Sequence, residues 1–326
     1  MSTPAERAAL IEKIRRLPGQ VEALIADLTP EQLAGHFLPN EWSVAQNVHH
    51  LADSHMNSYI RCKLIATEEE PVLKPYDQDR WAVMPDATGV ALAPSLELLR
   101  ALHTRWVHFW ESLEPAEWER SGMHPESGIL TLAMILHIYA DHGEAHIDQM
   151  TRTLKAQYAQ LPANRQELMA WIDREWTSLQ QLVSRLGTQR LAMADANGWT
   201  AKDHLAHIAT WERSMVRRIL SGVPYFAALE IEDADEDRLT IDEANAILFQ
   251  RHQTEAATAV VASLEAAHQE TMDMLSSLPW ERLEAPLAAH LVYREEKEPR
   301  PGLWLVAANT YDHYLEHNLW LRTQLL

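Results

Sequence analysis

The same pattern occurs twice in this sequence, and the internal repeat constrains the fold more than any other feature. The segment EWSVAQNVHHLAD in the first half aligns with GWTAKDHLAHIAT in the second. Trp42 and Trp199 lie 157 positions apart in this register, as do His50 and His207. The register therefore selects His50, not its neighbour His49. A repeat at this spacing predicts two copies of one structural unit in a single chain.

A pair of histidines four residues apart follows each copy. His142 and His146 in YADHGEAHID match His313 and His317 in NTYDHYLEHN, with an offset of 171 positions. The larger offset is expected from a longer third helix and loop in the second half. Each half is therefore predicted to carry one histidine on its second helix and a pair on its fourth.

Helix signals fill the chain, whereas strand signals are rare. A capping oxygen stands three residues before an acid or amide at Thr3, Ser43, Asn164, Thr200 and Thr240, and apolar residues at three- and four-residue spacing follow each one. Ten glycines are too few for the turns of a sheet protein of 326 residues. The predicted fold class is all-α, with long helices at residues 3–28, 43–68, 93–113, 129–154, 163–188, 200–222, 240–278 and 303–325.

Length and composition agree with two domains. A chain of 326 residues with 47% hydrophobic side chains can bury one large core or two cores of ordinary domain size. The polar stretch KAQYAQLPANRQ separates the halves, and Asn164 starts the next helix. We therefore expect one bundle at residues 1–157 and a second at 158–326. Within the first, Pro18 and Gly19 predict a kink in the opening helix, or its break into two short helices.

The charge and the cysteine content limit which partners and which cell compartment we expect. Acidic residues outnumber basic ones by 47 to 28, which gives a formal net charge of −19. Because such a chain repels polyanions, we expect no nucleic acid and no anionic membrane as partners. A single cysteine, Cys62, excludes an intrachain disulfide, and no segment has the apolar run of a secretion signal or a membrane span. These features predict a cytoplasmic protein.

The histidine pairs indicate metal chemistry. Residues i and i+4 lie one turn apart on the same helix face, so each pair can direct two imidazoles at one point. A third histidine from a facing helix would complete a three-nitrogen set with open coordination positions, where a divalent ion keeps an exchangeable water. Imidazole nitrogen alone does not select among Zn, Ni, Fe and Mn. An open site of this kind can turn a water or a thiol into a nucleophile near neutral pH.

Several other residues are weaker candidates for a pocket. Asp53 could accept the second N–H of a ligand imidazole, and Gln149 and Glu212 lie near histidines of the two sets. Trp42 and Trp199 precede a helix N-cap and are expected to pack on the first turns, in a folding role.

The remaining features are expected to be structural. Cys62 is interpreted as a small buried hydrophobic residue. The acidic run EIEDADEDR from Glu230 lacks the glycine and spacing of a calcium loop, and is interpreted as a solvated connection. The histidines assigned to the surface or to packing are His36, His49, His55, His103, His108, His137 and His204.

The motifs resemble those of a known superfamily. WSVAQNVHHLAD followed by HIYADHGEAHIDQ resembles the DinB/YfiT-like four-helix bundles, and the second half, with RQELMAWIDREW, GWTAKDHLAHIATWER and NTYDHYLEHNLW, is similar to the ClbS/DfsB-like branch. The resemblance implies two tandem four-helix bundles of up-down-down-up order that form an intrachain pseudo-dimer, each with a three-histidine metal site. The implied ligands are His50, His142 and His146 in the first unit and His207, His313 and His317 in the second. Since Gly143 and Glu144 replace Tyr314 and Leu315, the two pockets are expected to differ in shape.

The resemblance also implies an activity. It points to a divalent-metal-dependent enzyme that acts on a small electrophilic molecule, either by hydrolysis or by transfer of a low-molecular-weight thiol, which would then be a co-substrate. The sequence assigns no catalytic residue, and it allows a monomer or a homodimer. Two alternatives stay open: a non-catalytic bundle that sequesters a small molecule, and a structural bundle whose histidines are only buried and hydrogen-bonded. The fold alone does not decide among them.

Overall fold

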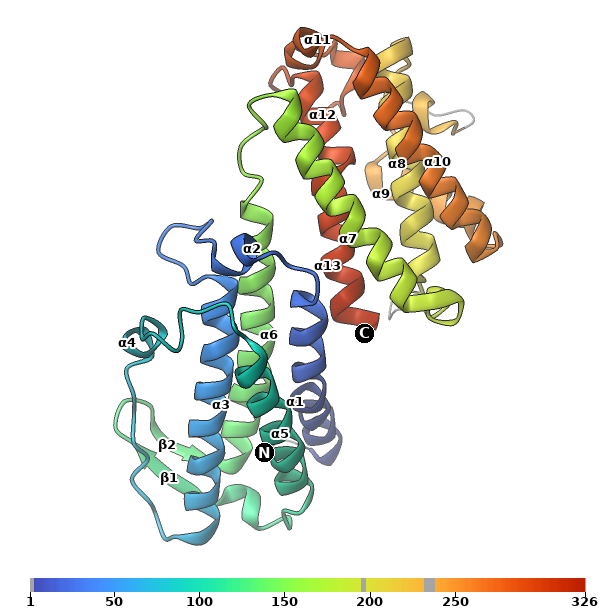
Figure 1. Cartoon of the computed structure of the whole chain (residues 1–326). Coiled ribbons are helices and arrows are strands. Elements are labelled where there is room, and N and C mark those ends of the chain that lie inside the picture. Colours follow the sequence, from blue (N-terminus) through green and yellow to red (C-terminus); the bar gives the residue numbers. More distant parts are fainter. Residues whose placement is uncertain (1–2, 195–197, 232–237, 326) are drawn as a thin grey trace. The chain divides into compact units, whose positions relative to one another are not determined.

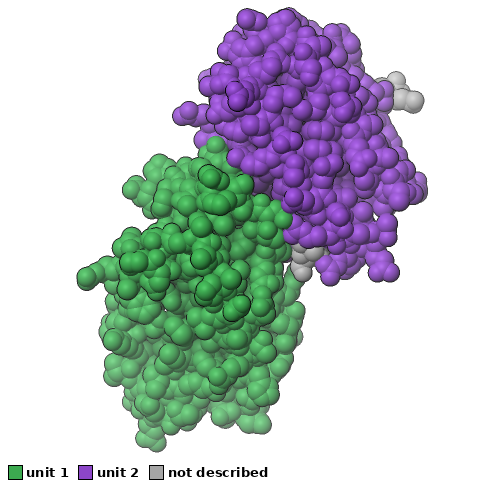
Figure 2. Space-filling model, in the orientation of Figure 1, with its two compact units in different colours: residues 1–157 green, residues 158–326 purple. Residues whose placement is uncertain are grey.

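The computed structural model describes residues 3–194, 198–231 and 238–325. It divides the chain into two compact units, Met1–Gln157 and Tyr158–Leu326, which Figure 2 colours separately. Each unit has long helices packed side by side, and the all-α class predicted from the caps and spacing is confirmed. Among the described helices, none combines the length and apolar character that a membrane crossing requires.

The helix starts predicted from the capping residues are those of the structure. Full capping boxes, with reciprocal hydrogen bonds between the cap and the third helical residue, open the helices that follow Thr3, Ser43, Thr200 and Thr240. Asn164 also caps its helix, with its side chain accepting the N–H of Glu167. Local hydrogen bonds that the sequence specifies therefore set where these helices begin.

The first unit is a four-helix bundle of α1 (Pro4–Ile25), α3 (Val44–Thr67), α5 (Ala93–Glu111) and α6 (Leu132–Ala156). Helices α1 and α6 run in one direction and α3 and α5 in the other, which is the up-down-down-up order (Figure 1). Helix α3 packs against both α5 and α6, so residues on α3 can meet residues of either helix. Short helices α2 (Pro30–Ala34) and α4 (Gln78–Ala82) lie in the connections.

A β-hairpin precedes the fourth helix of this unit, where the sequence predicts the helix itself from residue 129. Strands β1 (Ser121–His124) and β2 (Gly128–Thr131) pair antiparallel. The ring of His124 accepts the N–H groups of two turn residues, and Gly128 supplies a φ of 77° that other residues rarely adopt. The prediction is wrong there because this turn chemistry precedes the true cap, Thr131.

The second unit repeats the arrangement. Its long helices are α7 (Arg165–Leu191), α8 (Ala201–Ser221), α10 (Ala257–Ser277) and the consecutive pair α12 (Gly302–Asn309) and α13 (Tyr311–Leu325). Helices α8 and α10 run together, opposite to α7 and α13 (Figure 1). Shorter elements are α9 (Ile241–His252), which packs on α8, and α11 (Trp280–Glu284).

Two helices predicted as continuous are interrupted. The span 240–278 divides into α9 and α10 because the buried Lys202 donates to the carbonyls of His252 and Gln253, where α9 ends. The span 303–325 divides at Thr310, whose φ and ψ are −126° and −110°. Asn309 and Thr310 donate side-chain hydrogen bonds to backbone carbonyls four residues earlier, which competes with regular helix geometry.

Pro18 does not break the first helix. Helix α1 is continuous from Pro4 to Ile25 with Pro18 inside it, so the alternative of two short helices is wrong. Proline lacks an N–H, and the carbonyl four residues earlier, that of Ile14, therefore receives no hydrogen bond from position 18.

Candidate metal centres

The first unit brings together the three histidines that the repeat singles out. Helix α3 supplies His50, and α6 supplies His142 and His146 from successive turns. The Nε2 atom of His142 lies 3.4 Å from Nε2 of His50 and 3.1 Å from Nε2 of His146. One nitrogen from each ring lies within 4.8 Å of the others. We call this group the first triad.

The rings of the first triad are neutral at pH 7. Burial, followed by the nearby His146, lowers the pKa of His50 to about 3. Burial is also the main cause that lowers the pKa of His142 to about 2 and that of His146 to about 4. Neutral imidazoles keep a lone pair on one nitrogen, and this is the form that binds metal ions.

A hydrogen bond orients His146. Its Nδ1 lies 2.7 Å from the amide oxygen of Asn47, and the amide nitrogen of Asn47 donates to the Ser43 carbonyl over 2.9 Å. Because the second bond uses the nitrogen end of the amide, the oxygen faces His146 and accepts from Nδ1–H. The Nε2 lone pair of His146 then points at the other two rings, as a metal ligand requires.

The second unit assembles an equivalent group, the second triad. Helix α8 supplies His207, and α13 supplies His313 and His317. Nε2 of His313 lies 3.1 Å from Nε2 of His207 and 3.0 Å from Nε2 of His317. Burial lowers the pKa of His313 to about 4 and holds that of His207 well below its ordinary value.

The outer contacts of the two triads differ. At the position of Asn47 the second unit has His204, whose Nδ1 lies 3.0 Å from Nδ1 of His317. Within the described residues, Nδ1 of His313 is buried and has no hydrogen-bond partner. The orientation of the second triad is therefore less constrained than that of the first.

Both triads fit a divalent metal ion. Three nitrogens at about 2.1 Å from one ion are about 3.0 to 3.4 Å apart in octahedral or tetrahedral geometry. Two separations in each triad fall in this range, 3.4 and 3.1 Å in the first and 3.1 and 3.0 Å in the second, and the three ligand nitrogens of each triad lie within 4.8 Å of one another. Three neutral rings also leave coordination positions for a water or a substrate. The donor sets thus suit an open, reactive site better than a closed structural one.

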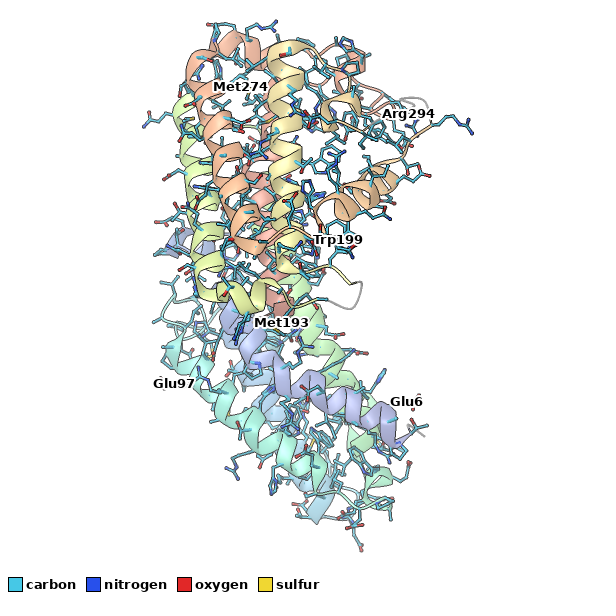
Figure 3. All side chains as sticks on the ribbon, turned by 90° about the vertical axis from the view of Figure 1, so that its right-hand side faces the viewer. Glu6, Glu97, Met193, Trp199, Met274 and Arg294 are labelled. Atoms are coloured by element: carbon cyan, nitrogen blue, oxygen red, sulfur yellow. The ribbon has the colours of Figure 1, made fainter. Side chains whose placement is uncertain are left out.

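A cavity borders the second triad. It has a volume of about 380 Å³, and His207 and His313 form part of its wall. Aromatic rings form much of the remainder, and these residues are Trp211, Tyr225, Tyr293 and Trp304. A neighbouring hollow of about 510 Å³ reaches His207 and His317 and is lined by Trp199. Figure 3 shows Trp199 close to the start of α8. A small molecule with an apolar or planar part would fit beside the triad.

Carboxylates also line the cavity of the second unit. Glu316 stands between His313 and His317 on α13, and Glu296 comes from the preceding loop. Glu296 accepts a hydrogen bond of 2.9 Å from Arg300. The position of Glu316 in the first unit is occupied by Ala145, because the repeat matches YLEHN to GEAHI. The first unit thus has no carboxylate at the position of Glu316.

The weaker sequence candidates do not all reach a triad. Among the described residues, no hydrogen bond joins Asp53 to His50, and Asn47 orients a ligand instead. Gln149 donates to Glu41 over 3.1 Å and also interacts with the ring of His146, so this candidate does lie at the first triad. Glu212 is fully buried and accepts the Tyr314 hydroxyl.

The expectation of a buried, inert Cys62 is confirmed, because burial raises the pKa of its thiol to about 12. Within the acidic run from Glu230, residues 232–237 lie outside the described residues.

The two repeated tryptophans lie against the triads. The Trp42 ring is 4.6 Å from that of His50 and stacks over His146 at 6.1 Å, and the Trp199 ring is 6.0 Å from that of His207. They therefore wall the sites in addition to any role in starting a helix.

Three histidines that sequence reasoning assigned to the surface or to packing also belong to the sites. His204 contacts the second triad, as described above, and His55 and His103 are buried behind the first. The His55 ring is hydrogen-bonded to His142. Burial lowers the pKa of His103 to about 4 and that of His55 well below its ordinary value.

The other four histidines assigned to the surface or to packing lie outside the triads. His49 is hydrogen-bonded to Ser95 and to the Gly89 carbonyl, and His36 is hydrogen-bonded to the Glu41 carbonyl. His108 and His137 are exposed.

The fold and the sites together define a class: tandem helical bundles that each present three imidazoles from their second and fourth helices. The family model described as the DinB superfamily matches residues 13–150 and again residues 172–317. This chain therefore belongs to the DinB superfamily. The double match also agrees with the tandem duplication inferred from the repeat.

Curated relatives cover one unit's length of this chain. A protein of Oceanobacillus iheyensis named "Putative metal-dependent hydrolase" is 43% identical over 145 residues, which are 44% of this chain and 84% of the relative. A Bacillus mycoides protein of the same description is 45% identical over 141 residues, or 43% and 81%. The solved structure of YfiT from Bacillus subtilis, described as "a probable metal-dependent hydrolase with an unusual four-helix bundle topology", is 35% identical. It covers 47% of this chain and 88% of its own, with a TM-score of 0.46.

Proposed function

We propose that this protein is a divalent-metal-dependent hydrolase of small molecules and that its second unit holds the reactive site. The observation that carries the proposal is the cavity of about 380 Å³, where His207 and His313 meet aromatic walls and the carboxylate of Glu316. The description of two relatives as metal-dependent hydrolases supports hydrolysis over thiol transfer.

Each part of the cavity has a role in this proposal. His207, His313 and His317 hold the ion, which when bound supplies the Lewis acidity that makes a water nucleophilic near neutral pH. Glu316 lies on the same helix as two ligands and is placed to accept the proton of that water. The aromatic walls bind the apolar part of the substrate and exclude bulk water.

The first unit holds a second metal site in this proposal. Its Nε2 atoms lie 3.4 and 3.1 Å apart, close to the separations in the second triad, but Ala145 stands where the second unit has Glu316. Hydrolysis is therefore assigned to the second unit. Zn, Ni, Fe and Mn all accept three imidazole nitrogens, so metal analysis must identify the native ion.

The partners follow from the charge and the cavity. A net charge of −19 supports a small-molecule substrate and no nucleic acid. We place the activity in the cytoplasm, because a single buried cysteine suits a reducing compartment.

The test begins with metal content. Elemental analysis of the untagged chain should give about two equivalents of divalent metal, one of which is lost in His142→Ala/His146→Ala and the other in His313→Ala/His317→Ala. Absence of metal from all three proteins, even after reloading, would contradict the proposal.

Turnover is the second measurement. The reloaded proteins are assayed against esters, amides and lactones, with and without added low-molecular-weight thiols. Hydrolysis should be lost in His313→Ala/His317→Ala and kept in His142→Ala/His146→Ala. A product that forms only with thiol would show transfer instead. Stoichiometric capture of a compound without turnover would show a sequestering protein.

A further inference from the structure

A line of buried hydrogen bonds runs from the first triad through α3 and α5 to α1. Nδ1 of His142 lies 3.1 Å from Nε2 of His55, and Nδ1 of His55 lies 2.8 Å from Nε2 of His103. Nδ1 of His103 then lies 2.6 Å from the carbonyl oxygen of Ile14 in α1. His55 and His103 are 0% and 2% exposed, so water does not compete for these bonds. We call this line the histidine chain.

The carbonyl at the end determines the direction of every bond in the histidine chain. A carbonyl oxygen only accepts, so Nδ1 of His103 carries the hydrogen, and in the neutral ring its Nε2 must accept. His55 then donates from Nδ1 and accepts at Nε2. His142 consequently donates from Nδ1, which leaves the lone pair of its Nε2 facing His50 and His146.

Pro18 explains why this carbonyl is available. The carbonyl of Ile14 would receive the N–H of residue 18 in a regular helix, and proline has none. The sequence feature that predicted a disturbed helix therefore leaves an acceptor inside the bundle, and His103 from α5 donates to it. Trp106 stands edge-on to both His55 and His103, which restricts rotation of the two rings.

The second unit lacks this arrangement. Glu212 occupies the repeat position of His55 and accepts the Tyr314 hydroxyl. Within the described residues, Nδ1 of His313, the counterpart of His142, has no hydrogen-bond partner. The comparison within one chain shows that a bundle of this type can be built without the chain of rings, which argues against a purely architectural need for it.

We propose that His55 and His103 are positioning residues that hold His142 in the tautomer required for metal binding, so that the first triad is more preorganised than the second. This inference rests on the proposed metal function of the triads. Partners that orient a ligand imidazole and settle its tautomer typically contribute 10- to 100-fold to metal affinity.

The test measures Zn²⁺ affinity in the full chain by competition with a chromophoric chelator. All variants are made in a background chain that also carries His313→Ala/His317→Ala. In this background the first triad is the histidine triad that can bind Zn²⁺. In this background His103→Phe should weaken Zn²⁺ binding by about 10- to 100-fold. His103→Gln should restore most of the affinity, because its amide can donate to Ile14 and accept from His55.

His49→Phe is the matched control. His49 is a buried histidine with two hydrogen bonds, to Ser95 and to the Gly89 carbonyl, and it lies on the same helix as His50 and His55. Its loss should leave Zn²⁺ affinity near that of the background. Equal effects of His103→Phe and His49→Phe would overturn the inference. A background that binds no Zn²⁺ would instead contradict the proposed metal function.

A second measurement needs no variant in the histidine chain. Long-range ¹H–¹⁵N spectra of the metal-free protein report which nitrogen of each histidine carries the hydrogen. His142, His55 and His103 should all be protonated at Nδ1. An Nε2–H tautomer at His142 or His55 would overturn the inference, even if His103→Phe fails to fold.

Discussion

Glu316 is the residue whose loss should separate chemistry from metal binding. It lies between His313 and His317 along α13 and lines the cavity of the second unit. Its counterpart in the first unit is Ala145. Glu316→Gln keeps the size of the side chain but removes its basicity, so kcat should fall by about 10²- to 10⁴-fold while metal content stays at the wild-type value. The measurement is steady-state kinetics on a substrate from the turnover screen, with metal analysis of each preparation.

Glu144→Gln is the control for this substitution. Glu144 lies beside His142 in the first unit and pairs with Lys13 at the surface. The kcat of Glu144→Gln should match that of the wild type. An unchanged kcat in Glu316→Gln would remove the general-base role from that residue.

Asn47 offers a test of ligand orientation in the first triad. Its amide oxygen accepts from Nδ1 of His146 at 2.7 Å. Asn47→Ala should weaken Zn²⁺ binding at this triad by about 10- to 100-fold, because the imidazole loses its orienting partner. Asn57→Ala is the matched change, since Asn57 on the same helix bonds to the Asp53 carbonyl. Chelator competition measures the Zn²⁺ affinity of both variants. Equal affinities would show that Asn47 does not orient the ligand.

Glu212 should make the stability of the second unit depend on pH. Burial raises the pKa of its carboxyl from 4.5 to about 8. Because the folded-state pKa is the higher one, its contribution is fully present below about pH 4.5 and is lost as the pH rises to about 8, roughly 5 kcal/mol in all. Glu212→Gln does not ionise and still offers an oxygen to Tyr314.

Urea unfolding of the metal-free wild type and Glu212→Gln between pH 5 and pH 9 measures this effect. The free energy of unfolding of the wild type should fall relative to that of the variant up to about pH 8 and then run parallel to it. Parallel curves over the whole range would show that the Glu212 carboxyl is already ionised at pH 5 in the folded protein.

At the scale of elements, Lys202 sets the end of α9. Lys202 is 8% exposed, and its ammonium contacts Asp203 at 2.6 Å and two backbone carbonyls. Lys202→Met should lower the free energy of unfolding by about 3 to 5 kcal/mol, because it leaves a buried carboxylate without its cation. Lys13→Met, which breaks a half-exposed pair with Glu144, should cost less than about 1 kcal/mol. Denaturant unfolding compares the two, and similar losses would contradict this account of the helix end.

The element boundaries also show what the sequence can and cannot specify. Caps such as Ser43 and Thr200 are local hydrogen bonds, and the repeat register of His50 and His207 is a property of the sequence alone, so helix starts and triads were predictable. The role of His103 was not predictable, because it depends on the packing of α5 against α3 and on the Ile14 carbonyl of α1, which receives no hydrogen bond from Pro18. The end of α9 depends likewise on Lys202, fifty positions away.

At the scale of the whole molecule, each unit has its own compact body and its own triad. A ligand that binds only the folded state stabilises what it binds, by an amount set by its concentration relative to Kd. Zn²⁺ at the first triad should therefore slow hydrogen exchange in α3 and α6, and Zn²⁺ at the second should slow it in α8 and α13.

Hydrogen–deuterium exchange with mass spectrometry resolves these helices in the intact chain. In His142→Ala/His146→Ala, Zn²⁺ should no longer protect α3 and α6 but should still protect α8 and α13, and His313→Ala/His317→Ala should show the reverse. Loss of protection in all four helices from either variant would mean that the two units fold and bind metal as one cooperative body. The two repeats would then form one cooperative folding unit with two sets of metal ligands. The activity assigned to the second unit would in that case depend on the folding of the first unit.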